Sequence, residues 1–246
     1  MKILLLDTET SPNTAFVWGL FNENIPLARL IDTSEVLCWS AKWYGEKEIM
    51  FASVFDSTRK QLLKRIHTLL AEADVVITYN GARFDIPVLN KEFFLAGMVP
   101  PAPYKQLDLY QVVKRQFRFA SNKLDHISEE LGFGKKKETT FKLWVDCMNR
   151  DPNAWAIMED YNRHDVVLLE KLYMVAMPWI TNHPNHCLYK DGEMVCPTCG
   201  GIHIQKRGFA RAKSLTYRRY QCQECGSWFK DTKAIDKDKK PKLGKI

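Results

Sequence analysis

Two carboxylates that follow a short apolar run are the first residues in this chain that could do chemistry. Asp7 and Glu9 come directly after the apolar residues 3–6, with one residue between them. Such a run predicts a strand buried on both faces of a sheet, and strand alternation places both acids on one side. Acids that close together need a cation to stay ionised, and a divalent metal would serve. The alternative is that Asp7 and Glu9 only begin a turn, since an Asp-x-Glu pair often occurs by chance.

Two further acids lie in segments with a recognisable local pattern. Asp85 follows a turn at Asn80 and an aromatic residue, Phe84, so it either contributes to a site or only caps a helix. Asp165 stands four residues after Tyr161, which places both side chains on one face of a helix. The alternative for that second segment is an amphipathic surface helix.

The elements that must position these acids indicate an α/β fold. Hydrophobic periodicity, turn residues and caps predict three strands, a helix, a strand and a second helix, followed by a mostly helical region. The expected elements are a hairpin of residues 36–44 and 47–54, a helix over 57–73 capped by Ser57, a strand over 74–78, a helix over 84–96, a strand over 106–109 and helices from there to 175. Asp108, in the predicted strand over 106–109, is either a supporting carboxylate or a cap.

Taken in chain order, these acids resemble a known set of motifs. Asp7 with Glu9, then Asp85, then Tyr161 with Asp165 resemble the three motifs of the DnaQ-like 3′–5′ exonucleases of the ribonuclease H-like superfamily. The Tyr-x-x-x-Asp spacing is that of the DEDDy subgroup. The resemblance implies an α/β fold with a mixed five-stranded sheet flanked by helices.

The similarity covers roughly residues 1–180 and includes segments outside the three motifs. Residues 123–125, Lys-Leu-Asp, and 131–132, Leu-Gly, are similar to those of family B polymerase proofreading domains and of the stand-alone YprB-like nucleases. The resemblance also implies substrate contacts for Thr8, Asn80 and Phe84. Aromatic residues near Phe16 and Trp18 could stack on terminal bases, although core packing is the commoner role for aromatic side chains.

These residues are suited to phosphodiester hydrolysis. This reaction needs a water activated near neutral pH and a counter-charge for the departing 3′ oxygen, and two divalent ions about 3.5–4 Å apart supply both. Carboxylate oxygens suit Mg²⁺ or Mn²⁺. By the resemblance, Asp7 would bridge both ions, Glu9 and Asp165 would hold the ion that activates water, and Asp85 would help to hold the other. Tyr161 would orient the attacking water.

The expected activity is therefore a metal-dependent 3′–5′ exonuclease that releases mononucleotides, with single-stranded DNA as the favoured substrate. An exoribonuclease is one alternative. Another is a non-catalytic nucleic-acid-binding or processivity factor that keeps the nuclease fold as a scaffold. The retention of every acid speaks against that alternative, because four clustered acids without a metal would destabilise the fold.

Four cysteines near the C-terminus form two Cys-x-x-Cys pairs. Cys196 and Cys199 are separated by 22 residues from Cys222 and Cys225, and a glycine follows each pair. This pattern predicts one structural Zn²⁺ held by four thiolates in a zinc ribbon, with a β-hairpin between the pairs. A redox role is disfavoured because the motif is doubled. Alternative zinc ligands are His183, His186 and Cys187.

Positive charge is concentrated in the same region. Residues 202–246 contain 13 Lys and Arg against 4 Asp and Glu, whereas residues 1–201 contain 23 against 25, so the net charge of +7 comes entirely from the C-terminal part. Such asymmetry is typical of a polyanion-binding appendage, although a basic tail can also serve only solubility. Arg218 and Arg219, interleaved with aromatic residues, would suit a nucleic-acid strand, unless the aromatics only form the small core of the ribbon.

These features divide the 246 residues into four parts. We expect a nuclease domain over residues 1–180, a linker over 181–192, a zinc ribbon over 193–232 and a basic, disordered tail over 233–246. No apolar run approaches the roughly 18 residues that span a bilayer, and the N-terminus is too acidic for a signal peptide. We therefore expect a cytoplasmic protein of bacterial or phage type, with nucleic acid and replication or repair proteins as partners.

Overall fold

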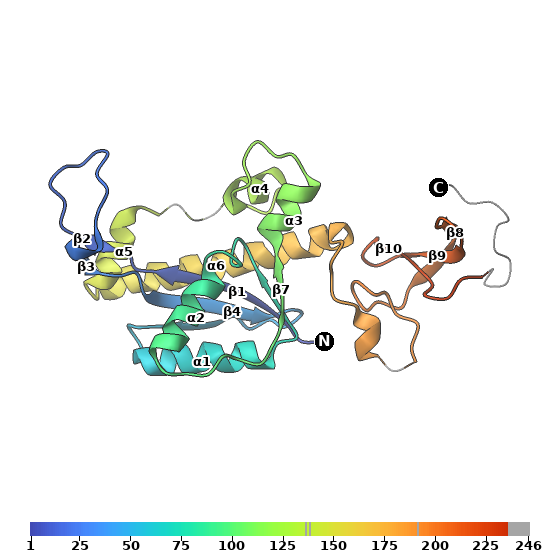
Figure 1. Cartoon of the computed structure of the whole chain (residues 1–246), viewed down its shortest axis with the longest axis horizontal. Coiled ribbons are helices and arrows are strands. Elements are labelled where there is room, and N and C mark those ends of the chain that lie inside the picture. The colour runs from blue at the N-terminus through green and yellow to red at the C-terminus, as the bar shows by residue number, and fades with distance from the viewer. Residues whose placement is uncertain (136, 138, 191, 236–246) are drawn as a thin grey trace. The chain divides into compact units, whose positions relative to one another are not determined.

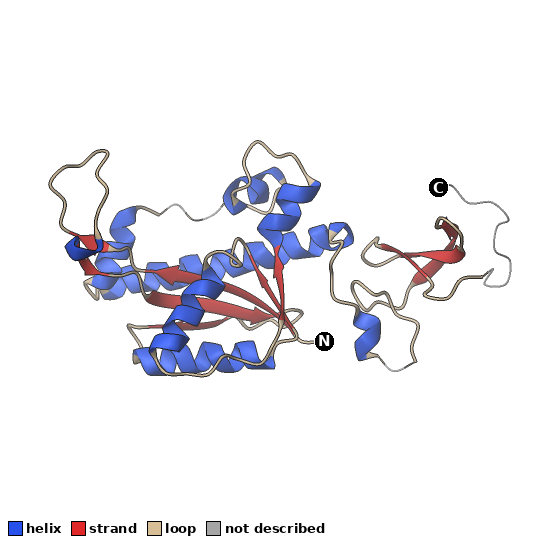
Figure 2. Cartoon of the chain, viewed as in Figure 1, coloured by secondary structure: helices blue, strands red, loops and turns tan. Residues whose placement is uncertain are grey.

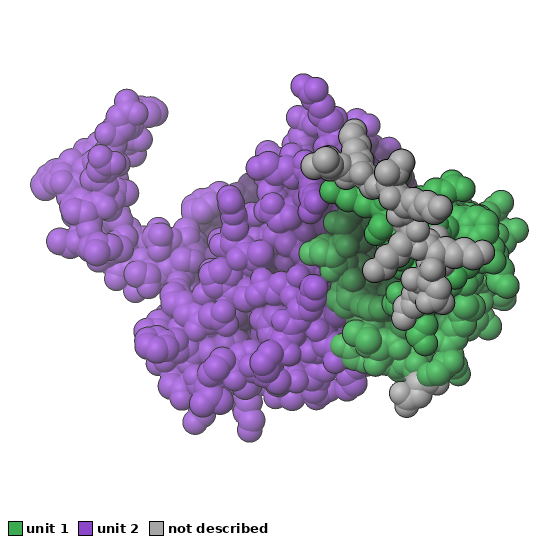
Figure 3. Space-filling model, turned by 45° about the vertical axis from the view of Figure 1, so that its right-hand side comes forward, with its two compact units in different colours: residues 1, 173–246 green, residues 2–172 purple. Residues whose placement is uncertain are grey.

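The structure is a computed structural model that describes residues 1–135, 137, 139–190 and 192–235 (Figure 1). The chain divides into two compact units, one of residues Lys2–Leu172 and one that begins at Tyr173 and includes Met1 (Figure 3). The boundary falls inside helix α6, Pro152–Ala176. Most of the predicted tail lies outside the described residues.

The first unit is built on one mixed five-stranded sheet in the order β5-β4-β1-β6-β7 (Figure 2). The central strand β1 runs parallel to β6 and antiparallel to β4, β5 is antiparallel to β4, and β7 is parallel to β6. The strands are β1 Ile3–Thr10, β4 Val36–Trp43, β5 Met50–Ser53, β6 Val75–Thr78 and β7 Lys105–Asp108. This sheet confirms the predicted ribonuclease H-like fold class.

Helices cover both faces of this sheet. Figure 1 shows α1 and α2 on one face and the long α6 on the other. Besides α6, the α-helices are α1 Arg59–Glu72, α2 Asp85–Leu95, α3 Leu109–Gln116, α4 Leu124–Glu130 and α5 Phe141–Met148. Short 3₁₀ helices lie at Leu27–Arg29, Met177–Trp179 and His186–Tyr189.

The cap of α1 differs from the sequence-based expectation by one residue. Thr58 rather than Ser57 caps the helix, because Thr58 and Gln61 form a capping box in which each side chain accepts from the other's backbone N–H. The Ser57 hydroxyl instead donates to the Ser53 carbonyl at 2.7 Å. The helix therefore begins at Arg59.

Strand β1 supplies the centre of the core. Its residues Ile3 to Leu6 are all buried, and alternate side chains face opposite helical layers. Leu4 and Leu6 pack in one apolar cluster with the buried face of α1 and with α2 residues such as Phe93. A strand buried on both faces holds its backbone rigidly, so any side chain near its end is well positioned.

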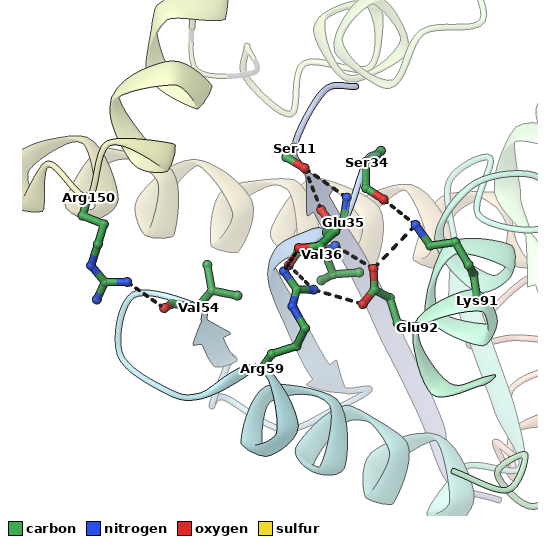
Figure 4. A network of polar contacts seen from close by, with 9 residues as sticks. All are labelled: Ser11, Ser34, Glu35, Val36, Val54, Arg59, Lys91, Glu92 and Arg150. Carbon is green, nitrogen blue, oxygen red and sulfur yellow. Dashed lines mark hydrogen bonds and ion pairs between the residues drawn. The ribbon is translucent and has the colours of Figure 1, made fainter. Parts of the chain in front are cut away.

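A polar network joins α1, α2 and the start of β4 (Figure 4). The Glu92 carboxylate on α2 is buried and accepts a hydrogen bond from Arg59 of α1 at 3.0 Å and one from the Val36 backbone N–H at 3.4 Å. Arg59 also forms an ion pair with Glu35, and Lys91 lies 3.6 Å from the Glu92 carboxylate. The network fixes both helices to the strand that pairs with β1.

Two short strands were not predicted from the sequence. β2, Thr14–Ala15, pairs with β3, Leu30–Asp32, and a loop of mostly exposed apolar residues joins them. Strands of two and three residues are too short for alternation to be visible in a sequence. The sequence therefore has no pattern from which these two strands could be predicted.

The second unit contains a three-stranded antiparallel sheet in the order β10-β9-β8. Its strands are β8 Ile204–Arg211, β9 Thr216–Cys222 and β10 Trp228–Lys230. The hairpin of β8 and β9 is the one expected between the two cysteine pairs. Among the described residues, the structure contains no helix with the length and apolar character of a membrane span.

We expect Arg59→Met to lower the free energy of unfolding by about 1–3 kcal/mol, because the buried Glu92 carboxylate would lose its best donor. Lys60→Met, at an exposed position of the same helix, is the matched control and should change stability by less than about 0.5 kcal/mol. Urea denaturation of both variants makes the comparison. Equal stabilities would show that the network does not hold the helices.

Candidate active site

Asp7 and Glu9 lie in the part of strand β1 that pairs with a neighbouring strand on one side only. The parallel pairing of β1 with β6 ends at Leu5 opposite Ile77, whereas its antiparallel pairing with β4 continues to Thr10 opposite Val36. From Asp7 onward the edge that would face β6 is therefore open. Pairing with β4 extends the strand through both acids to Thr10.

Three carboxylates from two elements meet at this open end. Ligand oxygens of Asp7, Glu9 and Asp165 all lie within 4.8 Å of one another. Asp7 and Glu9 occupy alternate positions of β1 and thus one face of the sheet, and Asp165 comes from α6, which covers that face. The Asp165 side chain is only 2% exposed. Like charges this close together, one of them buried, favour a bound cation.

Asn162 fixes the orientation of Asp7 and was not predicted from the sequence as a site residue. Its side-chain Nδ2 donates to the Asp7 carboxylate at 2.6 Å, and Asn162 is fully buried. It precedes Asp165 by three residues, so both project from the same face of α6. That spacing could have indicated that Asn162 belongs to the site, but an asparagine next to a tyrosine in a helix is equally consistent with a residue of the core.

Asp85 lies beside this group but outside it. Its Oδ1 accepts hydrogen bonds from the Thr8 backbone N–H at 2.9 Å and from the Thr8 hydroxyl at 2.7 Å. The Asp85 carboxylate thus takes the N–H that a longer β6 would have bonded. Asp85 is the first residue of α2, whose N-cap, Phe84, makes no side-chain cap bond. The helix-capping alternative therefore does not describe Asp85.

Burial raises the pKa of Asp85 to about 6. The hydrogen bonds from Thr8 oppose that shift, and the charge of Asp108 adds to it. At neutral pH this carboxylate is therefore ionised at a cost in stability unless a cation lies nearby. Thr8, predicted to bind substrate, is itself buried and directs both of its donors to Asp85.

The turn that brings Asp85 to β1 is held by Asp108. The Asp108 Oδ1 accepts from the Tyr110 N–H at 3.0 Å, which caps α3, and from the Asn80 N–H at 2.8 Å. Asn80 has a positive φ of 65°. At Gly81 an added Cβ would come within 2.4 Å of the Thr78 side chain, so only glycine fits there. Asp108 thus acts as a cap that also fixes the turn.

The aromatic candidates lie in different environments. Tyr161 is buried, and its ring meets Trp144 edge-on at a centroid distance of 5.9 Å within an apolar cluster. Phe84 is 45% exposed at the start of α2. Phe16 and Trp18 are 73% and 90% exposed in the loop between β2 and β3, so core packing does not explain these two residues.

The donor set fits a hard divalent cation. Besides the three carboxylates, the Ser40 hydroxyl oxygen and the Asn162 Oδ1 are buried and have no hydrogen-bond partner among the described residues. Ser40 lies on β4 directly opposite Asp7, so its side chain is on the same face. Oxygen-rich sites of this kind suit Mg²⁺ or Mn²⁺ better than softer metals. Burial, together with the charges of Glu9 and Asp7, raises the pKa of the Cys38 thiol, which therefore stays protonated.

Comparison with known families agrees with this geometry. The family model described as RNase_H superfamily matches residues 31–177, which is more than half of the chain. The chain belongs to the RNase H superfamily. The matched segment includes Asp85, Asn162 and Asp165 and begins after the β1 acids.

One solved structure has a fold similar to that of this RNase H-superfamily chain. The chain is similar to the family B DNA polymerase from the hyperthermophilic archaeon Pyrobaculum calidifontis, with a TM-score of 0.55 and 17% sequence identity. The likeness covers 72% of this chain but only 24% of the polymerase chain, so at this identity it shows a shared fold. No curated protein matches the sequence.

The second unit of this RNase H-superfamily chain holds the four cysteines together. The Sγ atoms of Cys196 and Cys225 are 3.7 Å apart, those of Cys199 and Cys222 are 3.6 Å apart, and all four lie within 4.8 Å of one another. Four sulfurs about 2.3 Å from one tetrahedral ion would be roughly 3.8 Å apart. The separations therefore fit a four-thiolate metal site.

The alternative ligands named from the sequence have other contacts. His183 Nε2 forms a hydrogen bond with the Tyr173 hydroxyl at 2.7 Å, and the Cys187 thiol donates to the Val195 carbonyl at 3.3 Å. Burial lowers the pKa of His186 to about 4. Neither histidine nor Cys187 is part of the four-cysteine group.

We expect Asp85→Asn to stabilise the metal-free protein at pH 8 by roughly 2 kcal/mol. The folded-state pKa of Asp85 lies above its unfolded value near 4, so the folded state binds more protons and wild-type stability falls as pH rises from about 4 to 7. The asparagine Oδ1 can still accept the Thr8 bonds, and the variant has no charge to bury.

Thermal denaturation at pH 4 and pH 8 without divalent ions provides the measurement. The stabilisation should be present at pH 8 and absent at pH 4, and Asp32→Asn, at an exposed site, should show neither effect. A variant that is less stable than wild type at pH 8 would contradict the cost assigned to the Asp85 charge.

Proposed function

We propose that the chain is a divalent-metal-dependent 3′–5′ exonuclease that acts on single-stranded nucleic acid, with DNA as the favoured strand, and releases mononucleotides. The observation that carries the proposal is the close approach of the Asp7, Glu9 and Asp165 carboxylates at the open end of β1 in an RNase H-superfamily fold. Residues 1–180 would form the catalytic domain and residues 193–232 the ribbon, joined by a linker over 181–192. The basic tail over 233–246 would add non-specific attraction.

The proposed chemistry gives each residue a distinct task. Two bound divalent ions would supply an activated water and a counter-charge for the departing 3′ oxygen. Asp7, Glu9 and Asp165 would hold these ions, and Asn162 would keep the Asp7 carboxylate turned toward them. Asp85, fixed by Thr8, would complete the set from the open edge of β1. Tyr161 would orient the attacking water, as the DEDDy resemblance implies.

Exonuclease polarity rests on the resemblance rather than on the fold alone. The motif order and the Tyr-x-x-x-Asp spacing resemble the DEDDy group, and the likeness to a family B DNA polymerase supports the same assignment. The alternative is a nucleic-acid-binding factor without activity. Such a factor would gain nothing from three carboxylates held this close together, because their mutual repulsion costs stability in the absence of a cation.

The ribbon supports a second metal of a different kind. We propose one structural zinc ion on Cys196, Cys199, Cys222 and Cys225, because thiolates are soft ligands and the Sγ separations fit a tetrahedron. Backbone N–H groups of Thr198 and Gly201 point to the Cys196 and Cys199 sulfurs at 3.4 and 3.3 Å, which would stabilise their thiolate forms.

Hydrolysis of a 5′-labelled oligonucleotide tests the activity. In Mg²⁺ the wild-type protein should shorten single strands one nucleotide at a time from the 3′ end, and Asp165→Asn should reduce the rate by at least about a thousand-fold while the protein stays folded. Asp32→Asn is the matched control for charge and should keep full activity. DNA and RNA strands of the same sequence, tested side by side, establish which is preferred.

Two outcomes would overturn the assignment in different ways. Opening of closed single-stranded circles would make the protein an endonuclease, and a strand blocked by a 3′-phosphate that is cut at the normal rate would remove the 3′ polarity. Full activity in Asp165→Asn would show that chemistry occurs elsewhere in the chain.

Metal analysis tests the ribbon. The purified protein should contain one zinc per chain, and Cys196→Ser should lose it because three thiolates bind far more weakly than four. Cys187→Ser, which changes a thiol outside the group, should retain zinc. Zinc retained by Cys196→Ser but lost by Cys187→Ser would favour the alternative ligand set.

A further inference from the structure

The two faces of the ribbon sheet carry different kinds of side chain. Residues alternate along β9, so Tyr217 and Arg219 point to one face while Arg218 and Tyr220 point to the other. Residues directly opposite in the neighbouring strands share the face of their partner. The strand register therefore assigns the residues of β8 and β10 as well.

One face is occupied by the ribbon's own core. Tyr220 is buried, stacks on Phe229 at a centroid distance of 5.7 Å and donates its hydroxyl to Asp231 at 3.2 Å. Arg218 on this face lies 4.6 Å from the ring centroid of Phe209. The same face carries Cys222 of the four-cysteine group. Arg218 is therefore engaged with the packed side of the sheet.

The opposite face carries Gln221 and four larger residues, Tyr217, Arg219, Trp228 and Lys230, and we term these four the open face. Arg219 lies 4.9 Å from the Trp228 ring centroid, and Lys230 lies 3.8 Å from that of Tyr217. Arg219 and Lys230 are exposed, and Trp228 is 54% exposed. Aromatic surfaces and cations thus alternate across two strands without being buried in a core.

The two cations of the open face repel each other. Arg219 and Lys230 are directly opposite in the antiparallel register of β9 and β10, where like charges destabilise a sheet. Among the described residues neither has an ion pair with a carboxylate, and the Arg219 side chain donates from Nε to the Arg207 carbonyl at 3.0 Å. An anion bound between them would relieve this repulsion.

Charge and chemistry together indicate what the anion belongs to. Residues 193–232 hold seven Lys and Arg against three Asp and Glu, so the whole ribbon attracts polyanions. Flat aromatic side chains beside the cations can stack on unpaired bases, which duplex DNA does not expose. An acidic peptide would be attracted by the charges but would gain little from the exposed indole.

We propose that the open face binds a single-stranded nucleic acid, with backbone phosphates at Arg219 and Lys230 and bases stacked on Trp228 and Tyr217. The proposal rests on the proposed function in one respect, because the bound strand would be the strand that the nuclease degrades. The face then acts as a holding site made of residues other than the carboxylates. It assigns Arg219 to substrate binding and removes Arg218 from that role.

Binding of a fluorescein-labelled oligothymidine to the full-length, zinc-loaded protein tests this, measured by anisotropy without added Mg²⁺ so that the strand stays intact. Trp228→Ala should weaken binding roughly ten-fold, and Trp228→Phe should recover most of the loss. Arg219→Gln should reduce the slope of log K against log salt by about 0.7. Arg218→Gln, which removes the same charge from the opposite face, should leave affinity and slope near wild type.

Equal losses in Arg218→Gln and Arg219→Gln would overturn the proposal, since net charge alone would then explain binding. Unchanged binding in Trp228→Ala would do the same, as would equally tight binding of polyglutamate. Zinc content of each variant verifies that the ribbon is intact. Hydrolysis of a trinucleotide in Mg²⁺, a minimal substrate for the carboxylates, is measured in parallel. Its absence in wild type would contradict the nuclease proposal, whereas the binding result alone decides the role of the open face.

Discussion

Repulsion among three carboxylates is the constraint on which the first unit depends. Carboxylate oxygens of Asp7, Glu9 and Asp165 lie within 4.8 Å of one another, and Asp165 is buried, so water screens its charge poorly. Such a group persists only if rigid elements hold its members. Strand β1, buried on both faces through Leu6, and the 25-residue helix α6 provide that rigidity. The sheet and its helices can thus be understood as a frame for an arrangement that is unfavourable by itself.

The unequal lengths of the strands beside β1 make the site accessible. Pairing with β6 stops at Leu5, and the Asp85 carboxylate takes over the next free N–H, that of Thr8. One short strand therefore both opens the edge and creates the need for an acceptor there. The raised pKa of Asp85 is the cost of using a buried carboxylate for this purpose. A cation at the site would lower that cost, so stability and metal binding are coupled.

The sequence predicted those features that local patterns determine. Alternation placed Asp7 and Glu9 on one face of a buried strand, helical spacing placed Tyr161 and Asp165 on one face of α6, and doubled Cys-x-x-Cys pairs predicted the four-sulfur group. The motif order indicated the superfamily, which the family comparison confirms. The five-stranded sheet followed from that resemblance more than from propensity.

Features that depend on contacts between distant segments were not predictable. The proximity of Asn162 and Ser40 to Asp7 depends on how α6 and β4 pack against β1. Asn162 is 155 positions from Asp7 in the sequence, so no local pattern indicates this contact. The Thr8 bonds to Asp85 depend on where β6 stops, which no pattern in β6 announces. In the ribbon, Arg218 and Arg219 looked equivalent in sequence, and only the strand register separates them.

Binding of Mn²⁺ to the zinc-loaded protein tests the central claim most directly, because it asks whether the acids form a metal site before any substrate is present. Isothermal titration, with electron paramagnetic resonance to count bound ions, should show Mn²⁺ bound by wild type, binding lost in Asp7→Asn, and affinity reduced roughly 10- to 100-fold in Asn162→Ala. Mn²⁺ binding that is unchanged in Asp7→Asn would contradict the account, because the acids of β1 would then hold no metal.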